Sequence, residues 1–112
     1  MDEKDLATTT EMVIRDFEIE RKENNTMSEQ ELFDMLADQI AYMIEYRLEF
    51  LLSLMYRLDI DEAKVNEALS PGNETPANVA LARIVLDRQK QRAFTKRFYK
   101  QDKLDDMDGL AF

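Results

Sequence analysis

The stretch from Leu32 to Leu58 constrains the fold of this chain more than any other, because it has the sequence of one long and unusually apolar helix. At about 100° per residue on a helical wheel, its apolar side chains spread over an arc of roughly 200°. A helix with one neighbour needs an apolar arc of only somewhat over about 100°. We therefore expect this segment to be covered on two sides. The arc comprises Leu32, Phe33, Leu36, Ala37, Ile40, Ala41, Met43, Ile44, Leu48, Phe50, Leu51, Leu52, Leu54, Met55 and Leu58.

The start of this helix carries a specific signal. Ser28 and Glu31 have the spacing of a capping box, in which each side chain accepts a hydrogen bond from the backbone N–H of the other residue. We therefore predict one continuous helix over residues 28–58. Its opposite face carries acidic side chains that should face water, namely Asp34, Asp38, Glu45 and Glu49.

Two further helices are predicted after the long one. Asp61 is suited to cap a short helix over residues 61–69. Thr75 and Pro76 are of the residue types preferred where a helix begins, so a third helix is predicted over residues 76–100. The short helix and the turn after it are long enough to reverse the chain. The two long helices should therefore form an antiparallel hairpin.

The chain divides into three predicted parts. Residues 1–27 are an acidic N-terminal arm or helix; the spacing of their apolar side chains favours a helix over about residues 9–22, and a mobile arm is the alternative. The helical domain is predicted over residues 28–103, and an acidic tail over residues 104–112.

The predicted fold class is all-α, with a helical hairpin as its centre. Two helices alone cannot cover an apolar arc of about 200°. Either the N-terminal segment folds over the exposed side, or two chains pair about a twofold axis into a four-helix bundle. We predict the second arrangement, a homodimer.

The composition restricts the chemistry. The 112 residues include no cysteine and no histidine, so thiolate chemistry, the commonest general base and the commonest transition-metal ligand are missing. We therefore expect no enzymatic activity, no cofactor and no metal site. The first ten residues lack the apolar run of a secretory signal, and no run of about 18 uncharged apolar residues follows, so we expect a cytoplasmic location without membrane contact.

Two acidic clusters resemble metal sites but depart from them at necessary positions. Residues 104–109 have part of the spacing of a calcium-binding loop, but Leu104 stands where such a loop needs a carboxylate. The acidic strip on the long helix lacks the histidines of carboxylate-bridged two-metal sites. We predict that both clusters are simply hydrated.

Arg47 departs from the apolar pattern, because it falls within the apolar arc of the long helix. A buried charge needs a partner. The simpler assignment is structural: either the side chain extends to place its charged end in water, or it forms an ion pair with an acidic residue such as Asp87. The other is recognition of a binding partner, in which Tyr42, Tyr46 and Tyr56 would complete the surface.

The net charge of −9 is unevenly distributed along the chain. Residues 1–75 carry 19 acidic and 7 basic side chains, a net charge of −12, whereas residues 76–103 carry 8 basic and 2 acidic side chains, a net charge of +6. The basic helix over residues 83–100 interleaves cations with aromatic rings, a combination that suits nucleic acid. The candidate contacts are Arg88, Arg92, Phe94, Lys96, Arg97, Phe98 and Lys100.

The same basic helix has a purely structural explanation. Basic side chains are favoured near the C-terminus of a helix by its dipole, and the acidic parts of the chain can neutralise them. The sequence therefore predicts first a small acidic protein-protein interaction module, homodimeric and without enzymatic activity. A nucleic-acid-associated factor is the alternative.

Overall fold

The computed structural model of the chain describes residues 3–20 and 27–106. Over those residues the regular structure is entirely helical, which confirms the predicted all-α class. The helices are α1 (Glu3–Asp16), α2 (Glu29–Tyr46), α3 (Leu48–Arg57), α4 (Glu62–Ala68) and α5 (Ala77–Asp106). In this part of the chain, no helix is long and apolar enough to cross a membrane.

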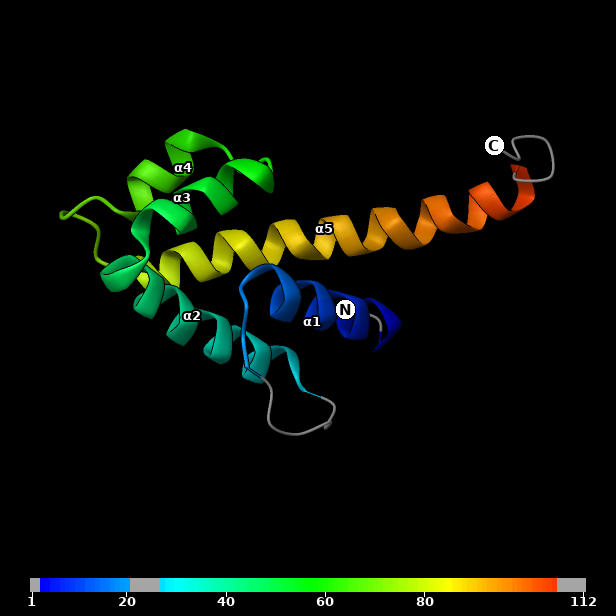
Figure 1. Cartoon of the computed structure of the whole chain (residues 1–112), viewed down its shortest axis with the longest axis horizontal. Helices are drawn as coiled ribbons and strands as arrows, with labels where there is room; N and C mark the ends of the chain where they lie inside the picture. The colour runs from blue at the N-terminus through cyan, green and yellow to red at the C-terminus, as the bar shows by residue number, and fades with distance from the viewer. Residues whose placement is uncertain (1–2, 21–26, 107–112) are drawn as a thin grey trace.

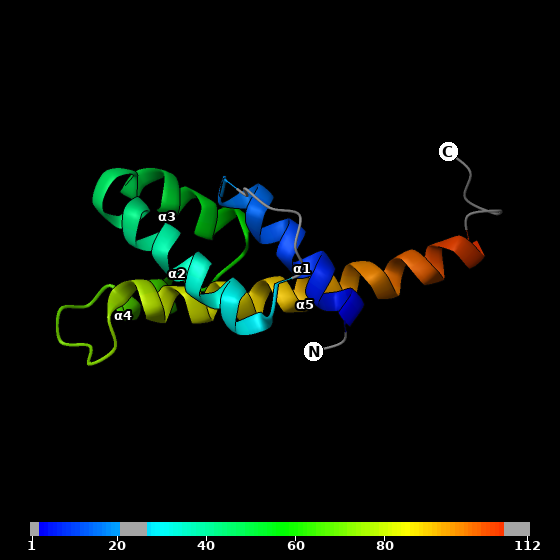
Figure 2. The same cartoon turned by 90° about the horizontal axis from the view of Figure 1, so that it is seen from below.

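α5 is the longest of these helices, and the others are arranged along it. Its 30 residues span about 45 Å. Figure 1 shows α1 and α2 on one side of α5 and α3 and α4 on the other. In both views the C-terminal end of α5 extends beyond the other helices (Figures 1 and 2). The molecule is therefore elongated, with extents of 52 × 32 × 22 Å.

One core joins the helices. Burying a large apolar side chain stabilises the fold by about 1.5–3 kcal/mol, so this cluster is the main source of stability. Val13 of α1 and Phe17, the first residue after α1, belong to it, and both are fully buried. The whole cluster comprises Val13, Phe17, Leu32, Leu36, Ala37, Ile40, Met43, Leu51, Leu54, Met55, Leu58, Val65, Ala68, Leu81, Ala82, Val85 and Leu86.

The prediction of one continuous helix over residues 28–58 is wrong, because the chain breaks at Arg47 into α2 and α3. Arg47 has a φ of −141° and a ψ of 46°, far from helical values. Its N–H still donates to the carbonyl of Met43 over 2.8 Å, and its own carbonyl accepts from the N–H of Leu51 over 3.0 Å. Turning the chain at this residue thus keeps both of its backbone groups hydrogen-bonded.

The break explains how so wide an apolar arc is covered. α3 turns back, so that Leu51 and Leu54 join the core that Ile40 enters from α2. α1 covers a further side, where Phe17 is fully buried. Part of the surface that we expected a second chain to cover is therefore covered by the same chain, whereas Leu48 and Leu52 stay exposed. The homodimer stays a prediction. Five helices pack together in the described residues, because the first long helix of the predicted hairpin is broken into α2 and α3 and the N-terminal helix is present.

The N-terminal helix is present, but it runs from Glu3 to Asp16 instead of over residues 9–22. It ends because Glu18 adopts the left-handed conformation, with a φ of 52°. The N–H of Ile19 then donates to the carbonyl of Ile14 over 3.0 Å. This is the hydrogen bond of a Schellman motif, in which glycine is the usual left-handed residue. The glutamate gave no such signal in the sequence.

α3 ends in the same way. Asp59 has a φ of 60°, and the N–H of Ile60 donates to the carbonyl of Met55 over 3.1 Å. The chain is thereby turned directly into α4, where the Asp61 carboxylate accepts from the N–H of Ala63 over 3.0 Å. The predicted cap and short helix are therefore confirmed.

The remaining helix boundaries agree partly with the sequence. The capping box is present, with the N–H of Glu31 donating to Ser28 Oγ over 3.1 Å and the N–H of Ser28 donating to Glu31 Oε1 over 3.0 Å. α5 begins one residue after Pro76 and continues to Asp106, past the predicted end at residue 100. Residues 107–112 lie outside the described part of the chain. The division into 1–27, 28–103 and 104–112 stays a prediction.

Candidate functional site

Most of the large apolar side chains that stay exposed in the described residues lie in one segment. Five of the seven lie within residues 42–56, and we refer to these five as the α3 surface. Exposed apolar residues that gather in one region are typical of contact sites. The α3 surface comprises Tyr42, Tyr46, Leu48, Leu52 and Tyr56, and the other two residues are Phe94 and Phe98.

The spacing on α3 explains why these residues share a face. Leu48, Leu52 and Tyr56 are four positions apart, so they lie above one another on the helix. Leu51 and Leu54 point instead into the core, where both are fully buried. Tyr56 is 86% exposed, the most of any large apolar residue described. α3 thus presents a second apolar ridge outward.

The end of α2 adds two aromatic rings to this surface. Tyr42 and Tyr46 lie in its last two turns, and their ring centroids are 5.1 Å apart at an interplanar angle of 45°. Tyr46 directly precedes the break at Arg47, and Leu48 directly follows it. The three tyrosines predicted as partner contacts are all exposed, and two of them contact each other.

Arg47 lies between α1 and α3 and is neither buried nor paired with Asp87. Its Nη2 is 3.3 Å from Glu18 Oε2, and its guanidinium carbon lies 4.2 Å from the centroid of the Phe50 ring. About a third of its side chain is exposed. The prediction of an ion pair is correct, but the partner is the left-handed residue that ends α1. The sequence could not identify Glu18, because the break at Arg47 directs its side chain.

A groove between α3 and α4 borders the α3 surface. It has a volume of about 290 Å³. Leu52 and Tyr56 belong both to its wall and to the α3 surface. Its lining is otherwise mainly apolar, and it consists of Leu52, Met55, Tyr56, Ile60, Glu62, Val65 and Asn66. We refer to it as the α3–α4 groove.

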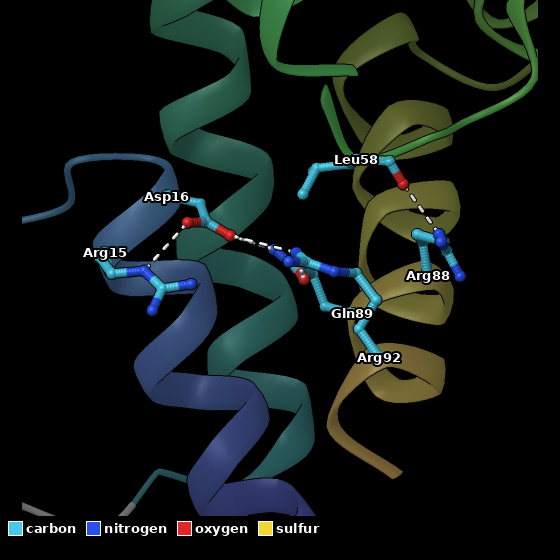
Figure 3. A network of polar contacts seen from close by, with 6 residues as sticks. All are labelled: Arg15, Asp16, Leu58, Arg88, Gln89 and Arg92. Atoms are coloured by element: carbon cyan, nitrogen blue, oxygen red, sulfur yellow. Dashed lines mark hydrogen bonds and ion pairs between the residues drawn. The ribbon is translucent and has the colours of Figure 1, made fainter. Parts of the chain in front are cut away.

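A polar network joins α1 to α5 (Figure 3). Gln89 is fully buried, and its Nε2 donates to Asp16 Oδ2 over 2.9 Å. Arg92 Nη1 donates to Gln89 Oε1 over 2.8 Å and lies 3.4 Å from Asp16 Oδ2. Arg15 Nε donates to the other oxygen of Asp16 over 3.1 Å. These contacts join the end of α1 to the middle of α5.

The network sets the charge state of Asp16. Burial alone would raise the pKa of this carboxyl group. Hydrogen bonds from Gln89 and Arg15, together with the positive charges of Arg15 and Arg92, outweigh that effect and lower the pKa below its usual value of 3.8. Asp16 is therefore a carboxylate at neutral pH, and it holds Arg92 against α1.

Two of the basic residues proposed for nucleic acid are held inside the protein. Arg92 takes part in the network with Asp16, and Arg88 Nε donates to the carbonyl of Leu58 over 2.8 Å (Figure 3). Lys96 is exposed and has no ion pair with any described residue. The side chains of Arg97 and Lys100 lie outside the described part of the structure.

The two aromatic candidates on α5 lie close together near its projecting end. Phe94 and Phe98 are 56% and 53% exposed, and their rings are stacked 6.4 Å apart at an interplanar angle of 13°. They come from successive turns of one helix, as their spacing predicts. Only part of the proposed basic and aromatic surface is therefore assembled by the described structure.

The acidic strip of α2 and α3 is exposed, as predicted, at Asp34, Asp38, Glu45 and Glu49. Among the described side chains, no three of His, Cys, Asp or Glu come close enough together to hold a metal ion. The calcium-like stretch over residues 104–109 falls mostly outside the described residues.

Sequence reasoning missed Asp16 and Gln89. Neither residue lies in a motif, and the two are 73 positions apart in the chain although they form a hydrogen bond. A polar residue on the buried face of α5, between Leu86 and Ala93, was the available signal. Comparison with known proteins adds nothing to this picture, since no family model, curated protein or solved structure matches the chain.

Proposed function

We propose that this protein is a small, non-enzymatic association module that binds protein through the α3 surface, and that a second copy of the chain is its first partner. The observation that carries the proposal is the exposure of five large apolar side chains within residues 42–56, whereas most other large apolar side chains of the described residues are buried or partly buried. The proposal retains the cytoplasmic location expected from the sequence.

The chemistry of the surface supports this function. Tyrosine is enriched in protein interfaces because its ring offers a large contact area at little cost in conformational entropy. Tyr42, Tyr46 and Tyr56 have such rings, and the Arg47 guanidinium is held at the centre of the segment by Glu18 and Phe50. Side chains that are ordered before binding lose less entropy when they bind.

A charge placed within the surface tests the proposal. We expect Leu52→Asp to weaken self-association at least tenfold, measured by sedimentation equilibrium, because the carboxylate would have to lose its water at the contact. Ser53→Asp is the matched control: it adds the same charge to the next residue of α3, which is exposed. Circular dichroism should show that both variants keep the helical fold. Equal association of Leu52→Asp and the wild type, or a wild type that stays monomeric, would overturn the proposal.

Nucleic-acid binding through the basic end of α5 is the weaker candidate. The exposed side chains of Lys96 and Phe94 favour it, but Arg88 and Arg92 are committed to internal contacts. The net charge of −9 also opposes approach to phosphate. Binding of single-stranded nucleic acid that falls steeply as salt rises, and that Lys96→Gln weakens, would support it.

A further inference from the structure

We propose that the C-terminal end of α5 docks, through Phe94 and Phe98, into the α3–α4 groove of a second copy of the chain, and that two such contacts form a closed dimer. The inference rests on the proposed association through the α3 surface and identifies what occupies it. It connects the two places where large apolar side chains are exposed in the described structure.

The docking helix carries a continuous stripe for helix packing. Positions 84, 87, 91, 94 and 98 of α5 alternate in steps of three and four, the spacing of a helix face that contacts another helix along its length. The first part of this face already has a neighbour: Ile84, Asp87 and Gln91 line a cleft of about 440 Å³ with Lys64 of α4 and the turn before that helix. Phe94 and Phe98 continue the same stripe past α4.

The groove has the complementary surface. Leu52, Met55, Ile60 and Val65 form apolar walls between α3 and α4, and Tyr56 adds an aromatic ring. Aromatic side chains gain both from leaving water and from edge or offset contacts with other rings. Two stacked phenylalanines on successive helical turns therefore suit a groove between two helices.

The charges of the two surfaces are opposite in sign. Residues 59–67, which border the groove, contain four acidic side chains and one basic one. Residues 93–100 of α5, which follow the internally paired Arg92, contain three basic side chains and no acidic one. Complementary charges at an interface speed the encounter and fix the orientation of the partners. A second copy of this chain thus supplies the basic, aromatic helix that the acidic rim of the groove attracts.

The shape of the molecule allows both contacts at once. Figure 1 shows α3 and α4 on one side of the first part of α5, while the end of α5 extends past them. A second copy turned end for end brings its α3 and α4 over the projecting end of the first copy, and the reverse contact forms at the same time. The result is a closed twofold dimer in which both grooves and both docking helices are occupied. Further chains therefore have no free docking surface, and growth into filaments is not expected.

Two variants, each with one introduced aspartate, and a mixture of the two proteins test the inference. Phe94→Asp places a charge on the docking helix, and Leu52→Asp places one in the wall of the groove. We expect each variant to have a dimer dissociation constant at least tenfold higher than the wild type, measured by sedimentation velocity. Thr95→Asp is the control for Phe94→Asp, since it places the same charge on the next residue, which is also exposed. Circular dichroism and thermal melting should be close to wild type for all three.

An equimolar mixture of Phe94→Asp and Leu52→Asp should recover association, because one chain still has a wild-type Phe94 and the other a wild-type groove. The mixed dimer should be tighter than either variant alone and weaker than the wild type. No recovery on mixing would overturn the reciprocal contact. Normal association of Phe94→Asp beside loss in Leu52→Asp would overturn this inference while supporting the proposed function. A wild type that stays monomeric would overturn both.

Discussion

The buried amide of Gln89 donates to the carboxylate of Asp16 over 2.9 Å, although the two residues lie 73 positions apart in the chain (Figure 3). A polar side chain without access to water needs partners inside the protein. Gln89 has one for its amide nitrogen in Asp16 and one for its amide oxygen in Arg92. The contact therefore fixes where α1 lies along α5.

Removing this amide should destabilise the fold. We expect Gln89→Leu to lower the free energy of unfolding by about 1–3 kcal/mol, because the partly buried carboxylate of Asp16 would lose a hydrogen bond that water cannot fully replace. Urea denaturation followed by circular dichroism measures the change. Gln91→Leu, at an exposed position two residues further along α5, should change stability by under about 0.5 kcal/mol. Equal losses in the two variants would contradict a specific role for the buried amide.

The lowered pKa of Asp16 predicts how stability depends on pH. The pKa lies below the usual 3.8 in the folded state, so near pH 4 the unfolded chain binds more protons than the folded one. The stabilisation is therefore complete above about pH 4 and is lost as pH falls through the lower folded-state pKa. The stability difference between wild type and Asp16→Asn should shrink over that range. A constant difference from pH 6 to pH 2 would contradict the prediction.

Glu31 also has a lowered pKa, because it forms hydrogen bonds with the backbone and side chain of Ser28. The comparison of wild type with Asp16→Asn isolates Asp16, because both proteins retain the capping box.

Asp59 adopts the left-handed conformation that glycine adopts more easily, and this predicts a stabilising substitution. Asp59 has a φ of 60°, which costs about 1 kcal/mol or more for a residue with a Cβ atom. Its carboxylate is almost fully exposed and 3.9 Å from Arg88, so little is lost with the side chain. We therefore expect Asp59→Gly to raise the free energy of unfolding by about 0.5–1 kcal/mol. Asp61→Ala, two residues later, should instead lower it by about 1 kcal/mol through loss of the α4 cap.

Arg47 should contribute little to stability through its charge. Its ion pair with Glu18 is partly exposed, and such pairs contribute about 0–1 kcal/mol. We expect Arg47→Met to reduce stability by under about 1 kcal/mol, since the methionine can still pack on Phe50. A double-mutant cycle with Glu18→Gln measures the coupling. A coupling energy above about 2 kcal/mol would show that the pair holds α1 in place.

The helix boundaries that were predictable are those determined by neighbouring residues. Ser28 and Glu31 satisfy each other's backbone groups within one turn, so the start of α2 could be inferred from their spacing. The cap at Asp61 is equally local. The ends of α1 and α3 were not predictable, because Glu18 and Asp59 adopt a conformation that glycine usually signals.

The candidate site was predicted only in part. The exposure of Tyr42, Tyr46 and Tyr56 follows from their positions on the helical wheel. The contribution of Leu48 and Leu52 was not foreseen, since both were assigned to the apolar arc that should be covered. Their exposure depends on how α3 is turned against the core after the break at Arg47.

The sequence by itself determined that the chain is helical and where several helices begin. It also determined that the most apolar segment needs cover on two sides. These properties depend on the spacing of residues within a few helical turns. Only the tertiary structure decided how that cover is supplied. A straight helix over residues 28–58 would keep the regular helical hydrogen bonds that the break at Arg47 interrupts, so burial of α2 and α3 in the common core with α1 and α5 has to outweigh that loss. The same burial decides which apolar side chains remain exposed.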